Sequence, residues 1–191
     1  NTPLEETLQA MVDIVKQGKA LYLGISRWPL EALKFADQYL KERDCPLLIF
    51  QDRLNMLDRA PQENGTLDYC HENGIGFISF SPLAQGLLTD RYLNGIPADS
   101  RAASGSQFLN PDQITEEKLQ KVRKLNAMAE ERGQKLSQMA LAWVLRHEDV
   151  TSVLIGASKA AQIDDAVGML ANRHFSAEEL ARIDAILSSS I

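Results

Sequence analysis

Apolar residues recur along the chain in two alternating patterns, one with helical spacing and one in short continuous runs. Four runs, at 20–26, 46–51, 75–80 and 150–155, are typical of buried β-strands. Apolar positions three and four residues apart predict helices at 3–17, 29–41, 66–73, 115–132, 136–147, 159–171 and 177–187. Strands that alternate with helices indicate βαβ units, hence a parallel sheet whose strands are buried on both faces.

Local signals mark the ends of several helices. Segments 2–5 and 176–179 read as capping boxes, and Ser137 is expected to cap the helix at 136–147. Gly18 is placed to end the first helix in a left-handed conformation, and Gly133 marks the end of the fourth.

The spacing of the strands leaves two architectures open. The first three start near residues 20, 46 and 75, so each of these intervals holds one strand and one helix. Four such strands could belong to a doubly wound sheet or to half of an eight-stranded barrel. A complete (β/α)8 barrel typically takes about 250 residues, and four strands alone would leave two sheet edges unpaired. If the fold is a barrel, residues 1–191 are expected to form its C-terminal half, with a long loop at 84–114.

Composition narrows the classes of function. The net charge of −6 gives no general attraction to nucleic acid or to an anionic membrane surface. No apolar run is long enough to span a membrane. Cys45 and Cys70 are too few for a disulfide framework, and neither belongs to a C-x-x-C pair. A metal site is therefore not expected, and a reducing, cytoplasmic setting is.

Neutral polar residues follow the apolar runs. The strand ends read GISRW, FQDR, FSPL and IGAS, and ligands of parallel α/β folds bind at the carboxyl ends of the strands. A single serine there is usually a turn former or a helix cap. Four ends that each offer a neutral hydrogen-bonding group are harder to explain by capping, and they suit an amide or hydroxylated ligand better than a metal.

Three longer motifs point to one family. "GKALYLGISRW", "FSPLAQGLLTDRYLNGIPADSRAAS" and "TSVLIGASKAAQI" together resemble the aldo-keto reductases, in the order that the family keeps. The similarity is strongest to the branch of bacterial L-glyceraldehyde 3-phosphate reductases and potassium-channel β subunits. The resemblance implies a (β/α)8 TIM barrel that binds NADP(H) across its carboxyl face. The four strands here would be the fifth to the eighth.

The resemblance also implies which residues meet the nicotinamide. Ser26 and Gln51 match the positions that hydrogen-bond its carboxamide, and Phe80 matches the aromatic ring that stacks on it. Arg27 stands where most of the family carries Asn, although the channel-β-like members share this arginine.

The remaining carried-over positions would bind the rest of the cofactor, where arginine suits phosphate because its planar donor fork can bind two oxygens at once. Ser158 would serve the 2′-phosphate at a helix N-terminus, although without the resemblance it is simply an N-cap. These positions are Ser81, Pro82, Leu83 and Gln85 for the pyrophosphate and ribose, Arg91 and Arg101 for the phosphates, and Gly156, Ala157, Ser158, Lys159, Gln162 and Asp165 for the adenosine end.

The family's acid–base groups have no match here. They are a tyrosine proton donor with a lysine, an aspartate and a histidine, all carried on the first four strands and so expected upstream of Asn1. None of the four tyrosines matches, so no catalytic residue is assigned and the chain alone is expected to be inactive. Leu54 stands where relatives commonly have an aromatic residue, which leaves the substrate preference open.

Three functions follow as hypotheses. The first is NADPH-dependent reduction of a small-molecule carbonyl, such as glyceraldehyde 3-phosphate or a methylglyoxal-like aldehyde, by an intact protein that could form a homo-oligomer. The second is a non-catalytic, NADP-binding redox sensor like the channel β subunits, favoured by Arg27-Trp28. The third, a doubly wound nucleotide-binding domain, lacks a G-x-G-x-x-G or G-x-x-x-x-G-K-[ST] loop.

Overall fold

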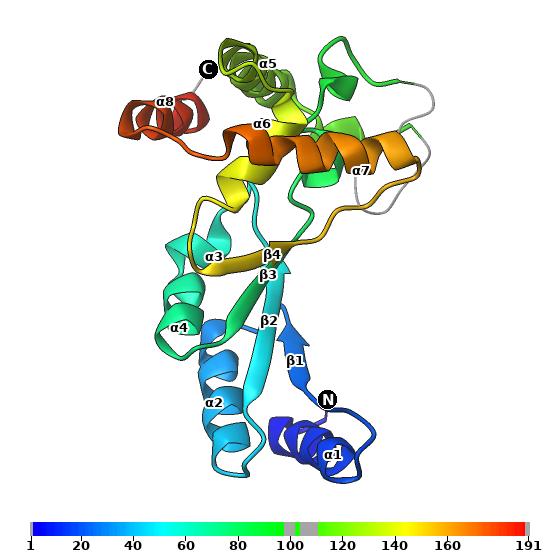
Figure 1. Ribbon diagram of the computed structural model, residues 1–191, viewed down its shortest axis with the longest axis vertical. Coiled ribbons are helices and arrows are strands. Elements are labelled where there is room, and N and C mark those ends of the chain that lie inside the picture. The colour runs from blue at the N-terminus through cyan, green and yellow to red at the C-terminus, as the bar shows by residue number, and fades with distance from the viewer. Residues whose placement is uncertain (1, 98–101, 104–110, 190–191) are drawn as a thin grey trace.

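Four strands form one parallel sheet in the chain order β1-β2-β3-β4 (Figure 1). The computed structural model describes residues 2–97, 102–103 and 111–189. All four predicted strands are present, and their parallel pairing is confirmed. The strands are β1 (Leu23–Ser26), β2 (Leu47–Arg53), β3 (Gly76–Phe80) and β4 (Val150–Val153).

Every helix that the apolar spacing predicted is present, and one short helix, α3, was not predicted. The predicted helix at 159–171 divides into α7 and a 3₁₀ segment, and three further 3₁₀ turns lie within the predicted loop at 84–114. No described helix is long and apolar enough to cross a membrane. The helices are α1 (Leu4–Lys16), α2 (Leu30–Lys41), α3 (Ala60–Glu63), α4 (Thr66–Glu72), α5 (Glu116–Glu131), α6 (Leu136–Val144), α7 (Ala160–Val167) and α8 (Ala177–Ser188), and the 3₁₀ turns are η1 (Ala84–Gly86), η2 (Asp90–Tyr92), η3 (Pro111–Gln113) and η4 (Gly168–Asn172).

Two of the predicted helix caps are wrong. The N-cap of α1 is Pro3, so Thr2 lies one residue outside the helix and caps nothing. Helix α6 begins at Leu136 with Lys135 as its N-cap, which puts Ser137 inside the first turn. The predicted cap residue misses the observed N-cap by one residue in α1 and by two residues in α6.

Other predicted helix ends are confirmed. The Ser176 Oγ accepts a hydrogen bond from the Glu179 N–H at 3.1 Å, and the Glu179 carboxylate accepts one from the Ser176 N–H at 2.7 Å. This is the reciprocal pair of a capping box. Gly18 has φ +69 after α1, as the left-handed ending predicted, and Gly133 follows α5 with φ +68.

One face of the sheet is packed against helices. A row of side chains in register across all four strands, Ile25, Phe50, Phe77 and Val150, is 0–6% exposed. Helices α2, α3 and α4 lie along one side of the sheet in Figure 1, while α5 to α8 gather at its upper end. The main hydrophobic core therefore lies between the sheet and these helices.

The opposite face has no such cover among the described residues. The next row in register consists of Ser26, Gln51, Ile78 and Ser152, of which the two serines are exposed and the other two partly buried. The sequence led us to expect burial on both faces, as parallel sheets usually have. Within residues 2–97, 102–103 and 111–189, nothing packs over this second face to bury it.

Exposed apolar side chains lie at both edges of this sheet. Leu21 and Tyr22, just before β1, are 82% and 71% exposed, and Leu154 after β4 is 44% exposed. Val167 and Leu170 of the α7–η4 segment are 58% and 57% exposed. Each of these positions leaves apolar surface uncovered within the described residues.

Candidate functional site

The parallel pairing brings several predicted site residues together at the carboxyl ends of the strands. Ser26 at the end of β1 lies in register with Gln51 of β2. Two residues further along β2, Arg53 lies in register with Phe80 at the end of β3. Because side chains two residues apart on a strand point to the same face, these four lie on the open face of the sheet.

Ser26 and Gln51 are only loosely bonded to each other. The Ser26 hydroxyl lies 3.5 Å from Oε1 of Gln51, well beyond the usual length of an O–H···O hydrogen bond. Among the described residues, Nε2 of Gln51 has no hydrogen-bond partner. A carboxamide needs both a donor and an acceptor, and this pair can supply both. The residues present therefore fit the nicotinamide end of the cofactor.

Arg27 adopts a conformation that is unusual for a residue with a side chain. Its φ is +60, and its backbone N–H donates to the Gln51 carbonyl at 3.0 Å. Its Nε lies 4.0 Å from a carboxylate oxygen of Asp52. Burial raises the pKa of the Asp52 carboxyl, and the Arg53 N–H and the Arg27 guanidinium partly offset that rise.

The Phe80 ring has two guanidinium groups beside it. The Cζ of Arg27 lies 5.9 Å from the ring centroid and the Cζ of Arg53 5.7 Å. Both distances are near the limit of about 6 Å for a cation–π interaction, so neither group holds the ring firmly. The position of Arg53 beside the Phe80 ring was not predicted. Its place two residues after Gln51, on the same face of the strand, is a signal that could have shown it.

The turn after β3 is built from left-handed residues. Ser81, Ala84 and Gln85 have φ of +50, +48 and +59, and Gly86 follows with +97. The Gln85 side-chain amide donates to the Ser81 hydroxyl at 2.8 Å. Left-handed residues in a turn can aim backbone N–H groups at an anion. The predicted pyrophosphate contact stays a prediction.

Pro82 and Leu83 anchor this turn to the interior of the protein. Pro82 is buried, and Leu83 packs against the main hydrophobic core. They hold the turn at the end of the strand, and their predicted contacts with the pyrophosphate and ribose stay predictions.

Only one of the two predicted phosphate-binding arginines can be placed. Arg91 is exposed in η2, where its backbone N–H donates to the Thr89 hydroxyl at 3.2 Å. Arg101 lies outside the described residues. Its predicted phosphate contact stays a prediction from the sequence.

The segment after β4 differs from its prediction in one respect. Ser158 is not the N-cap of α7, because that position belongs to Lys159. The Gln162 side chain bends back and accepts hydrogen bonds from the backbone N–H groups of Ser158 at 2.7 Å and Lys159 at 3.2 Å. Gly156 and Ala157 are exposed, and a Cβ at Gly156 would meet nothing within 4 Å.

Asp165 also has a protein partner. Its carboxylate pairs with the Lys135 ammonium at 2.6 Å. A phosphate beside Ser158 or an adenine beside this helix would thus replace existing contacts of Gln162 and Asp165. Their predicted contacts with the adenosine end stay predictions.

None of the tyrosines lies at the strand ends in an arrangement suited to proton donation. The Tyr69 hydroxyl, in α4, donates to Asp37 at 2.9 Å, and burial together with that carboxylate raises its pKa above the ordinary range. Tyr39 in α2 donates to Gln9, and Tyr92 is buried. The assignment of no catalytic residue to the chain stays a prediction.

The predicted place of the acid–base groups stays a prediction. We expected them upstream of Asn1, and Asn1 itself lies outside the described residues, which begin at Thr2. The strand ends that the structure describes contribute groups suited to binding a cofactor.

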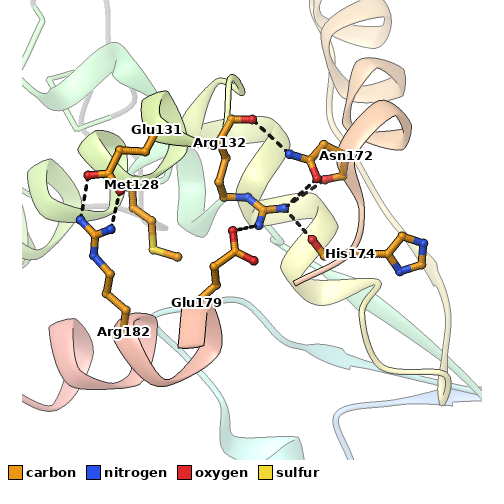
Figure 2. Close-up of a pocket in the computed structure, with 7 residues that line it drawn as sticks. All are labelled: Met128, Glu131, Arg132, Asn172, His174, Glu179 and Arg182. Atoms are coloured by element: carbon orange, nitrogen blue, oxygen red, sulfur yellow. Dashed lines mark hydrogen bonds and ion pairs between the residues drawn. The ribbon is translucent and has the colours of Figure 1, made fainter. Parts of the chain in front are cut away.

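Of two cavities among the described residues, the larger is not at the strand ends. It has a volume of about 480 Å³ between α5, α8 and η4, and ion pairs of Arg132 and Arg182 line it (Figure 2). The smaller, of about 240 Å³, is lined by Arg27, Trp28 and Arg53 among others. Position at the strand ends, not size, makes the smaller one part of the candidate site.

Comparison with known proteins supports the same interpretation. A sequence model described as the Aldo/keto reductase family matches residues 1–188. Proteins named L-glyceraldehyde 3-phosphate reductase from two strains of Escherichia coli are each 50% identical over 187 residues, which is 96% of this chain. A crystal structure of a thermostable aldo-keto reductase in complex with the inhibitor epalrestat matches 97% of this chain at 25% identity, with a TM-score of 0.70.

The matches cover only part of each relative. They include 54% of the length of the Escherichia coli proteins and 55% of the crystallised chain. The chain thus spans about half the length of the relatives that it matches. With residues 1–188 matched and half of the aligned residues identical to the Escherichia coli proteins, the chain belongs to the aldo/keto reductase family.

Proposed function

We propose that the protein reduces small aldehydes or ketones by hydride transfer from NADPH, and that this chain supplies the cofactor-binding half of a (β/α)8 barrel. The observation that carries the proposal is the group formed by Ser26, Gln51 and Phe80 on the open face at the strand ends. It offers a carboxamide-binding pair beside an aromatic ring. NADPH bound there would supply the hydride.

The open face of the sheet supports the half-barrel interpretation. A closed barrel fills its interior with layers of side chains from all eight strands. Here the row of Ser26, Gln51, Ile78 and Ser152 has no facing layer among the described residues. A further set of four strands would supply that layer and pair both edges. We expect the acid–base residues on those strands, so this chain alone would be inactive.

The substrate proposal rests on the relatives. Proteins named L-glyceraldehyde 3-phosphate reductase share half of the aligned residues with this chain, which favours a small, phosphorylated or otherwise polar aldehyde. The cysteines Cys45 and Cys70 are both free and buried, which supports the expectation of a reducing, cytoplasmic setting.

Titration of the intact protein with NADPH, followed by nicotinamide fluorescence, tests the proposal. We expect saturable binding, weakened about tenfold in Gln51→Leu because a hydrogen-bonded amide is lost. Gln38→Leu is the matched control, since Gln38 lies exposed on α2 and its side-chain amide donates to Glu42 on the same surface. If wild-type protein does not bind NADPH, the proposed function is wrong.

Turnover separates the reductase from the redox-sensing alternative. We expect the intact protein to oxidise NADPH when glyceraldehyde 3-phosphate or methylglyoxal is added. Tight NADPH binding without turnover of any small aldehyde would instead favour a non-catalytic sensor.

A further inference from the structure

Asn55 is a buried amide directly behind the turn that follows β3. It is 1% exposed, and its Oδ1 accepts hydrogen bonds from the backbone N–H groups of Leu57 and Asp58, both at 2.9 Å. Its Nδ2 donates to the carbonyl of Ser81 at 3.0 Å, across 26 residues of sequence. One side chain therefore closes its own turn and also holds the turn after the neighbouring strand.

Ser81 needs such support, because its φ of +50 is a conformation that residues with a Cβ rarely adopt. A strained conformation persists only where surrounding contacts hold it. Two donors meet at the Ser81 carbonyl, the Asn55 amide and the Ala84 backbone N–H at 3.0 Å. The Ser81 backbone N–H donates to none of the described residues, so it is free to bind a ligand.

We propose that Asn55 is a positioning residue for the cofactor, which holds Ser81 in its left-handed conformation and so aims the Ser81 N–H and hydroxyl at the pyrophosphate end of NADP(H). The proposal rests on the function proposed above. Asn55 does not itself face the ligand, because its side chain is buried and every polar atom of that side chain has a protein partner.

A neighbouring hydrogen bond supplies a control for general loop fastening. The Ser79 hydroxyl, fully buried, donates to the Leu54 carbonyl at 2.7 Å. This hydrogen bond joins the end of β3 to the segment after β2, as the Asn55 bond does, but it does not involve Ser81. Ser79→Ala should therefore loosen the segments without releasing the left-handed residue.

The test is Asn55→Asp in the intact protein. A carboxylate keeps both acceptor bonds to Leu57 and Asp58 but cannot donate to the Ser81 carbonyl. At about pH 8 we expect the Kd for NADP⁺ to rise about tenfold, the effect of one lost buried hydrogen bond. Burial raises the pKa of such a carboxyl, and its protonated form donates. The ratio of variant to wild-type Kd should then fall toward one as the pH is lowered to about 5.

Adenosine 2′,5′-bisphosphate, which lacks the nicotinamide and the pyrophosphate bridge, distinguishes positioning from partial unfolding. Asn55→Asp is expected to bind it as wild-type protein does, and Ser79→Ala is expected to keep the wild-type ratio of the two affinities. If Asn55→Asp does not fold at about pH 8, Asn55→Ser replaces it with the same expected selectivity, because its short hydroxyl can close the local turn but cannot reach Ser81.

Three results would overturn the inference. One is equal NADP⁺ affinity of folded Asn55→Asp and wild-type protein at about pH 8. Another is an equal loss of affinity for both ligands. The third is wild-type protein that binds no NADP⁺, which would remove the proposed function together with this inference.

Discussion

At the scale of single residues, Asp37 is a carboxylate that is almost completely buried in the folded protein. It is 2% exposed, and its Oδ2 accepts hydrogen bonds from Tyr69 at 2.9 Å and Lys41 at 2.7 Å. Its Oδ1 has no hydrogen-bond partner within the described part of the chain. A buried charge is tolerated only where donors compensate it, so both donors are needed.

We therefore expect Tyr69→Phe to destabilise the protein by about 1.5–3 kcal/mol, the range for a hydrogen bond to a charged group. Tyr39→Phe is the matched control, because its hydroxyl donates to the neutral side chain of Gln9 at 3.1 Å. That variant should lose about 0.5–1.5 kcal/mol. Urea unfolding measures both, and a smaller loss in Tyr69→Phe than in Tyr39→Phe would contradict the argument.

The buried thiol of Cys70, whose pKa the Asp37 charge helps to raise, should make the free energy of unfolding depend on pH. Burial, and then the charges of Asp37 and Asp52, raise the pKa of Cys70 from 9.0 to about 12. Because the thiol ionises more readily in the unfolded chain, its contribution to stability is complete below about pH 9. It is lost as the pH rises from there toward about 12.

Cys70→Ala should remove this loss. Unfolding free energies measured between about pH 8 and 10 are expected to fall less steeply with pH in Cys70→Ala than in wild-type protein. Cys45→Ala leaves Cys70 in place and should keep the dependence on pH that Cys70 causes. Parallel curves for Cys70→Ala and wild-type protein would show that the thiol does not ionise in this way.

At the scale of elements, Arg132 fastens the C-terminal helix to the body of the protein. Its side chain is 5% exposed, pairs with Glu179 of α8 and donates to the carbonyls of Asn172 at 3.2 Å and His174 at 2.9 Å (Figure 2). Its guanidinium also lies 4.0 Å from the centroid of the Phe175 ring. One planar group thus joins α5, η4 and α8.

Arg132→Lys should release α8, because an ammonium cannot reproduce this planar set of bonds. We expect a loss of about 1–3 kcal/mol, the range for buried hydrogen-bonding groups left without a partner, with faster amide hydrogen exchange in α8 than in α2. Arg182→Lys is the control, because Arg182 pairs with Glu131 on the surface between the same two helices. It should change little. Equal exchange in the two variants would contradict the role given to Arg132.

The elements also show how far sequence patterns lead. Apolar runs predicted all four strands, because the face that packs against the helices requires apolar side chains such as Ile25, Phe50 and Phe77. The apolar runs put Ser26 and Gln51 near strand ends, and the family resemblance assigned both residues to the nicotinamide. The left-handed Ser81 could not be predicted, because no local signal favours it and the Asn55 amide that holds it lies 26 residues away. The hydrogen bond from the Ser158 N–H to the Gln162 side chain could not be predicted either, because the sequence does not show which acceptor this N–H will bind.

At the scale of the whole molecule, the uneven cover of the sheet is the leading feature. Helices bury one face, while the other face and the apolar residues at both edges stay exposed within the described chain. In α7 and η4, which follow β4, the side chains of Ile163, Val167 and Leu170 repeat at helical spacing and are 49–58% exposed. A helix with an exposed apolar stripe is usually covered by another element. The proposed missing strands, with their helices, would lie against it.

Reconstitution tests this arrangement. Residues 1–191 alone should oxidise no NADPH with a small aldehyde, whereas addition of the separately produced remaining half of the Escherichia coli relative should restore turnover.

Val167→Glu together with Leu170→Glu should weaken that recovery at least tenfold, because burying one such side chain contributes about 1.5–3 kcal/mol. Phe35→Glu is the matched control, since Phe35 is 40% exposed on α2, which lies on the covered side of the sheet. Its recovery should equal that of wild-type chain. Turnover by residues 1–191 alone would show that the acid–base residues lie within this chain after all, and an equal loss in both variants would place the contact elsewhere.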